Sequence, residues 1–104
     1  MKKYILDLVV TQNIKLHANY VLIKLTHANP LPEMLPGQFA EIRIDGSNTT
    51  FLRRPISINY VDKTTNEVWF LVQLVGDGTR NLATVKQGDI VNVVMPLGLS
   101  LIHI

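Results

Sequence analysis

The sequence contains no cysteine and little charge. The absence of cysteine excludes a disulfide framework, a thiolate zinc site, a cysteine-ligated iron–sulfur cluster and a cysteine nucleophile within these 104 residues. Ten Lys and Arg residues against eight Asp and Glu residues leave a net charge of +2, which is too small to indicate nucleic-acid binding. No apolar run approaches the roughly 18 residues that a membrane-spanning helix needs.

The N-terminal segment lacks the features of a secretory signal. Two lysines precede a short apolar stretch, but Asp7 interrupts it and no small-residue cleavage site follows. We therefore expect a cytoplasmic protein without a membrane partner. Apolar residues are plentiful at 47%, and a chain of this size buries about two-thirds of its unfolded surface in one core. A disordered chain is thereby excluded.

Short strands dominate the sequence pattern. Five stretches alternate apolar and polar residues or are bounded by turn residues, and residues 67–75 are almost continuously apolar, as in a strand covered on both faces. The six predicted strands are residues 4–10, 18–26, 38–45, 51–60, 67–75 and 89–95. A short helix is predicted at Thr79–Lys86, with Thr79 as its N-cap and Gly88 as its C-terminal stop. This combination favours a closed antiparallel barrel.

Two arginines and a proline stand together inside one predicted strand. Pro55 removes a backbone donor from the ladder and frees a sheet edge. An anion beside that edge would meet the guanidinium group of Arg54 and, further on, the hydroxyl group of Ser57. The alternative is a solvated edge strand whose charges oppose aggregation. By alternation, Arg53 points to the opposite face from Arg54.

A glycine-rich turn precedes the predicted helix. Gly76-Asp77-Gly78-Thr79 would let backbone approach a ligand closely, with the N–H groups of the helix start directed at a phosphate. An ordinary strand-to-helix turn explains the same residues equally well. The three histidines, His17, His27 and His103, have no metal-ligand spacing, so we expect no metal site.

The order of these motifs resembles that of a known family. Arg54-Pro55-Ile56-Ser57, then Gly76 to Thr79, then Gly88-Asp89 and Pro96-Leu97-Gly98 are similar to the FAD-binding barrel of the ferredoxin–NADP reductase superfamily. The form Arg-Arg-Pro-Ile-Ser-Ile looks most like the electron transfer subunit of type B dihydroorotate dehydrogenase. The resemblance covers nearly the whole chain.

The resemblance implies a set of FAD-binding residues. Arg54 would pair with the diphosphate, and Ser57 would lie near the flavin ring. The segment Leu71-Val72-Gln73 would flank the ring and ribityl chain, and Gly78-Thr79 would form the phosphate turn. The implied cofactor-binding residues are Arg54, Pro55, Ile56, Ser57, Leu71, Val72, Gln73, Gly78 and Thr79.

The sequence departs from the family pattern in several places. Val72 and Gln73 occupy positions where this branch commonly has Tyr and Arg, and Met95 replaces the first Gly of Gly-Pro-Leu-Gly. The nicotinamide-binding domain and the cysteine cluster for a [2Fe–2S] centre, which the full-length relatives carry, are absent from these residues. We therefore expect residues 1–104 to form one FAD-binding domain, and we expect the isolated chain to be inactive.

The resemblance implies a six-stranded antiparallel Greek-key β-barrel with one short helix, all-β in class. In the full-length protein it would relay electrons from dihydroorotate oxidation to NAD in pyrimidine biosynthesis, beside a catalytic dihydroorotate dehydrogenase subunit. NAD would bind through the missing domain. Two alternatives stay open: the flavin subunit of an NADPH–ferredoxin or sulfide-type reductase, and a cofactor-free small β-barrel binding module. We also expect self-association through the apolar residues Leu99, Leu101, Ile102 and Ile104.

Overall fold

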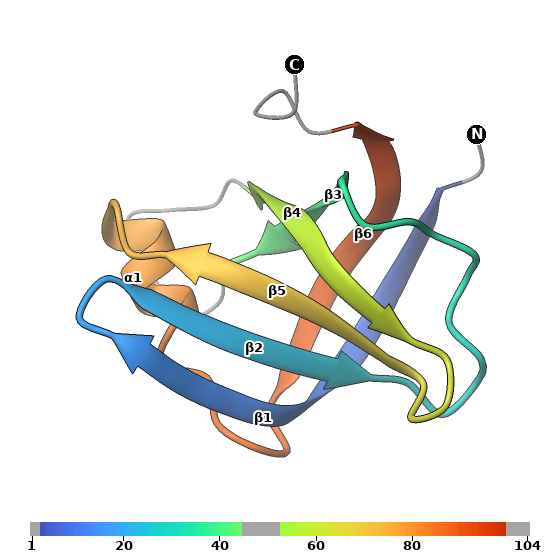
Figure 1. Ribbon diagram of the computed structural model, residues 1–104, viewed down its shortest axis with the longest axis horizontal. Helices are drawn as coiled ribbons and strands as arrows, with labels where there is room; N and C mark the ends of the chain where they lie inside the picture. The colour runs from blue at the N-terminus through green and yellow to red at the C-terminus, as the bar shows by residue number, and fades with distance from the viewer. Residues whose placement is uncertain (1–2, 45–52, 100–104) are drawn as a thin grey trace.

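Six strands close into one barrel in the computed structural model, which describes residues 3–44 and 53–99 (Figure 1). Around the barrel the order is β1-β2-β5-β4-β3-β6, and every neighbouring pair is antiparallel. The elements are β1 Tyr4–His17, β2 Tyr20–Thr26, β3 Gln38–Arg43, β4 Arg53–Asp62, β5 Glu67–Gln73, α1 Asp77–Leu82 and β6 Ile90–Leu99.

The strand order contains the Greek-key pattern. Strands β3, β4 and β5 are consecutive neighbours, and the long connection after β2 brings β2 beside β5 rather than beside β3. On the other side of the meander, β6 returns to lie beside β3. The predicted fold class, a six-stranded antiparallel barrel with one short helix, is confirmed.

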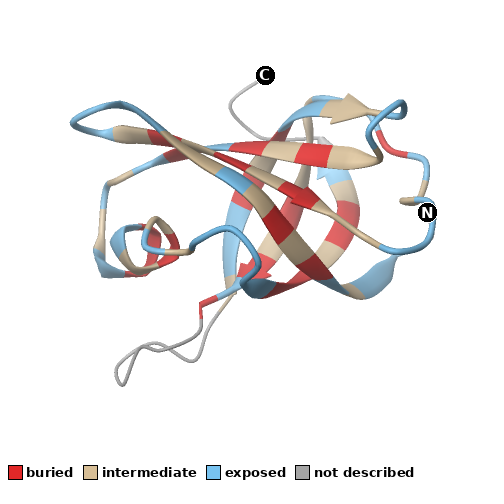
Figure 2. Cartoon of the chain, turned by 90° about the horizontal axis from the view of Figure 1, so that it is seen from below, coloured by how far each residue is buried: buried red, intermediate tan, exposed pale blue. Residues whose placement is uncertain are grey.

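The core lies inside the barrel and follows the alternation of the strands. Buried positions alternate with intermediate or exposed ones along most strands, so red bands interleave with tan and pale blue bands in Figure 2. Each strand turns one row of apolar side chains inward. The largest side chains with almost no exposure are Phe70, Leu8, Ile23, Leu25, Ile42, Ile58 and Met95.

The first strand is twice as long as predicted. The sequence predicts a strand over 4–10, but β1 continues to His17. Its first half pairs with β6 and its second half with β2, with register irregularities between Val10 and Gln12 and between Lys15 and His17. A bulge shifts the side-chain alternation by one residue, so the second half shows no regular apolar pattern in the sequence.

The helix begins and ends earlier than predicted. It runs from Asp77 to Leu82, with Gly76 as N-cap and Ala83 as C-cap, so the assignment of Thr79 as N-cap was wrong. Gly88 does not end the helix either. It adopts a positive φ of 93° in the turn before β6, where its N–H donates to the carbonyl of Val10 at 2.8 Å. That backbone conformation favours glycine, which is why the residue resembles a helix stop in the sequence.

The described helix is six residues long, too short to cross a lipid bilayer. The expected self-association through the C-terminal residues cannot be placed on this fold, since residues 100–104 lie outside the described part of the chain.

Two adjacent residues of β5 test which side chains of this strand point into the barrel and which point outward. We expect Phe70→Ala to lower the free energy of unfolding by about 3–5 kcal/mol, because Phe70 is fully buried. The matched change Leu71→Ala, at a residue that is 39% exposed, should cost roughly 1 kcal/mol or less. Urea unfolding of both variants measures the difference. Equal losses would show that β5 does not alternate as described.

Candidate functional site

The ladder between β4 and β5 stops half-way along both strands. Paired residues run from Ile58 with Phe70 to Asp62 with Glu67, and within the described residues no β4–β5 pairing continues beyond Ile58. Residues 53–57 of β4 pair only with β3, and residues 71–73 of β5 pair only with β2. The two strands therefore diverge toward the end of β5 that leads into α1 (Figure 1). The two diverging strand edges offer backbone groups to a ligand between them.

The β4 residues predicted to bind the cofactor face in different directions. Pro55 is exposed opposite Glu41 of β3, whereas Ile56 belongs to the buried core. Ser57 is half-buried opposite Phe39. Of this group, Pro55 and Ser57 lie on the outer face, while the side chain of Ile56 serves the core.

The β5 residues show the same division. Leu71 and Gln73 are exposed, and each lies opposite a β2 residue on the outer face. Val72 between them is 0% exposed, so its side chain packs in the core and only its backbone can take part in a site on the strand edge. The side chain at this position points into the core, where valine fits and a larger tyrosine would need more space. This is a physical reason for valine instead of tyrosine at position 72.

Arg54 and Gly78 come together from β4 and α1. Arg54 lies on the same side of β4 as the core residues Ile56 and Ile58, but it is exposed near the start of the strand. A β-carbon built on Gly78 would lie 2.9 Å from Nε and 3.3 Å from Cγ of Arg54. Any side chain at position 78 would displace the arginine. The two motifs singled out in the sequence thus lie side by side, and a residue larger than glycine at position 78 would require Arg54 to move.

Thr79 stabilises the start of the helix from within. Its Oγ1 accepts from the N–H groups of Val75 and Gly76 at 3.0 and 3.1 Å and donates to the carbonyl of Gly76 at 3.0 Å. The hydroxyl group is therefore fully engaged, and the residue is 8% exposed. The backbone N–H groups of Gly78 and Thr79 belong to the first helical turn, whose donors have no partner inside a helix.

Arg53 points away from Arg54 and binds the outer face of the barrel. Its Nη1 donates to the carbonyls of Glu41 and Asn92 at 3.2 and 3.3 Å, and its Nη2 donates to Oδ1 of Asn92. The amide of Asn92 in turn donates to Asp7 at 2.8 Å. The network ties the start of β4 to β3, β6 and β1. Sequence reasoning missed it, because its members are far apart in the chain.

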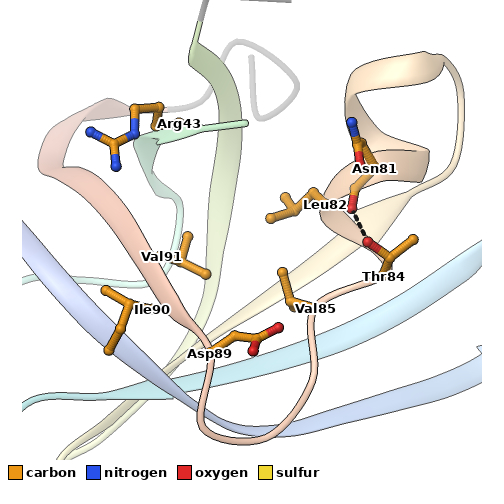
Figure 3. Close-up of a pocket in the computed structure, with 8 residues that line it drawn as sticks. All are labelled: Arg43, Asn81, Leu82, Thr84, Val85, Asp89, Ile90 and Val91. Atoms are coloured by element: carbon orange, nitrogen blue, oxygen red, sulfur yellow. Dashed lines mark hydrogen bonds between the residues drawn. The ribbon is translucent and has the colours of Figure 1, made fainter. Parts of the chain in front are cut away.

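A separate pocket of about 330 Å³ lies between α1, the turn that follows it, β6 and the end of β3 (Figure 3). Leu82, Val85 and Val91 supply apolar surface, and Arg43 and Asp89 supply charge. None of the nine predicted site residues lines this pocket. Among the described residues no three His, Asp or Glu side chains gather as a metal site.

Comparison with known proteins identifies relatives by sequence. No family model matches the chain. A dihydroorotate dehydrogenase B (NAD(+)) electron transfer subunit of Lysinibacillus sphaericus is 42% identical over 72 residues, covering 69% of this chain and 28% of the relative. The subunit of the same name from Fusobacterium nucleatum is 35% identical over 92 residues, covering 88% and 36%. The chain is homologous to these subunits. It spans about a third of their length.

Solved structures support the same assignment at the level of the barrel. An NADH-dependent reduced ferredoxin–NADP oxidoreductase superposes with a TM-score of 0.75 at 25% identity, covering 88% of this chain and 32% of that one. A ferredoxin reductase of carbazole 1,9a-dioxygenase gives 0.79 at 21% identity, covering 94% and 30%. A Neisseria gonorrhoeae ferredoxin NADP+ reductase solved with bound FAD and NADP gives 0.67 at 14%, covering 86% and 36%. The last two show the fold alone. The resemblance to ferredoxin–NADP reductase barrels is confirmed.

The hydrogen bonds of Thr79 predict its effect on stability. Thr79→Ala removes the hydroxyl group that satisfies two backbone donors, and we expect the free energy of unfolding to fall by about 1 kcal/mol. Thr79→Ser keeps the hydroxyl group and should retain most of the stability. Urea unfolding of both variants is the measurement. If serine were as destabilising as alanine, the role of Thr79 would lie in its methyl group and not in the cap.

Proposed function

We propose that this chain is the FAD-binding domain of an electron transfer flavoprotein subunit. The observation that carries the proposal is the contact between Arg54 and Gly78, beside the edge where β4 and β5 diverge. A guanidinium group and backbone N–H groups in one place suit a diphosphate, and two diverging strand edges suit a flat ring system. The homology to electron transfer subunits supports the same function.

Most of the predicted residues have a part that their position permits. Arg54 would bind the FAD diphosphate through its guanidinium group, together with the backbone N–H groups of Gly78 and Thr79. Gly78 is suited to this role because a side chain there would displace Arg54. Ser57 and the edge at residues 71–73 would orient the flavin ring. When bound, FAD would supply the electron-accepting and electron-donating chemistry that the side chains lack.

The remaining functions belong to a longer protein. By analogy with the relatives, we propose residues 1–104 as one domain, joined in that protein to a nicotinamide-binding part and a [2Fe–2S] centre. Its partner would be the catalytic dihydroorotate dehydrogenase subunit, and its electrons would pass to NAD in pyrimidine biosynthesis. We propose the cytoplasm as the location of this protein.

The two adjacent arginines give the sharpest test of the binding mode. We expect Arg54→Ala to weaken FAD binding by roughly ten- to a hundredfold, the value of one charge-assisted hydrogen bond of about 1.5–3 kcal/mol. Arg53→Ala is the matched control: it should affect FAD much less, because the Arg53 side chain binds Asn92 on the outer face. Titration of flavin fluorescence measures both.

Two results would contradict this assignment. A larger loss of affinity for Arg53→Ala than for Arg54→Ala would show that the wrong arginine has been assigned to the diphosphate. If the unsubstituted protein failed to bind FAD at any concentration, the barrel would instead be a cofactor-free binding module. Visible flavin absorbance of the purified protein distinguishes these cases before any titration.

The chain of 104 residues should not catalyse the complete reaction. We expect neither NAD(P)H oxidase nor dihydroorotate dehydrogenase activity. The sequence contains no cysteine for an iron–sulfur cluster, and the described residues form a barrel with no nicotinamide-binding domain beside it. Steady-state assays with NADH, NADPH and dihydroorotate, each with added FAD, provide the measurement. Robust turnover by the purified chain would contradict the expectation.

A further inference from the structure

Helix α1 is too short to hold its own position. It has six residues, Asp77–Leu82, and isolated helices shorter than about 12 residues are marginal in water. At its N-terminal end Thr79 accepts from the N–H group of the N-cap, Gly76, and near its C-terminal end Leu82 packs in the core with 4% exposure. The C-terminal end still has carbonyl groups that need donors from elsewhere.

One side chain from β1 satisfies a carbonyl at this end of the helix and a second one in the turn that follows. Nδ2 of Asn13 donates to the carbonyl of Ala83 at 2.9 Å and to the carbonyl of Val85 at 2.8 Å. Both hydrogens of the amide are used, and both acceptors lie in the segment that ends the helix. Two further carbonyls of this end are bonded locally: Asn81 accepts from Thr84, and Leu82 accepts from Val85.

Asn13 occupies a position that is otherwise apolar. In the β1–β2 register it lies opposite Ile23, which is 2% exposed in the core. An amide at the end of this inward row is explained by its two acceptors, since a half-buried polar group without partners would be costly. The bulge after Val10 brings Asn13 to this side of the strand.

The geometry points to Asn13 as a positioning residue for the site formed by Arg54 and Gly78. This inference rests on the proposed function and adds to it a residue that does not touch the cofactor. A helix of six residues is only about 9 Å long. We therefore expect a displacement of Ala83, at one end of the helix, to move Gly78 at the other end as well. The Arg54 side chain occupies the space beside Gly78 that a β-carbon would need, so a shift of the helix start changes where the two lie relative to each other.

The test compares two amide-to-carboxylate substitutions on β1. Asn13→Asp keeps the shape of the side chain but loses both donors and places a negative charge beside two carbonyls. Gln12→Glu is the matched control, because the neighbouring Gln12 is exposed on the outer face. Both variants add the same charge to the same strand. The full chain is titrated with FAD and, separately, with riboflavin, which lacks the diphosphate.

The ratio of the two affinities separates positioning from general destabilisation. We expect Asn13→Asp to weaken FAD binding by roughly three- to tenfold while riboflavin binding stays within twofold of the unsubstituted chain. Amide hydrogen exchange should accelerate at Arg80 and Ala83, whose N–H groups bond within the helix, and should stay unchanged in the strands. Gln12→Glu should change neither quantity.

The outcomes are distinct. If Asn13→Asp binds FAD as tightly as the unsubstituted chain, or loses FAD and riboflavin affinity equally, Asn13 is not a positioning residue and the proposed function stands. Unchanged exchange in the helix overturns the inference in the same way. If the unsubstituted chain binds no FAD, the proposed function fails and the inference falls with it.

Discussion

The contact between Arg54 and Gly78 is the constraint on which the proposed site depends. It brings a residue of β4 against a residue of α1 that follows it by 24 positions in the chain, with Nε of Arg54 only 2.9 Å from where a β-carbon on residue 78 would lie. Glycine here leaves space for the arginine, and no unusual backbone conformation demands it. Three other features determine where these two residues lie. The β4–β5 ladder ends beside them, Thr79 binds the backbone at the start of the helix, and Asn13 binds the backbone at its far end.

The adjacent arginines show how one strand serves two purposes. Arg54 follows the inward row of β4 but lies near its start, where it is exposed, whereas Arg53 binds across β3 to Asn92 on the outside. This half of β4 has a ladder on one edge only. The Arg53 side chain adds a hold on the paired side by reaching β6, the strand beyond β3, and the open edge remains available to a ligand.

The sequence predicted the barrel and the principal motifs because both depend on local patterns. Alternation located the six strands, and the glycine-rich turn marked the start of the helix within a few residues. The errors arose where long-range contacts decide the structure. The second half of β1 lacks alternation because of a bulge, and Thr79 accepts from the N-cap instead of being the N-cap. Asn13 could not be found at all, since its partners lie some 70 residues later.

The pairing of the first and last strands has a consequence for how the chain folds as it is made. Tyr4 lies opposite Met95 and Val9 opposite Ile90, so the first half of β1 acquires one of its neighbours only when β6 is present. On a ribosome the barrel therefore stays open until β6 has been synthesised. Such non-local pairing slows folding and leaves a strand edge exposed meanwhile. During that interval the nascent β1 is the segment that most needs a chaperone, because an unpaired apolar strand is prone to pair with another chain.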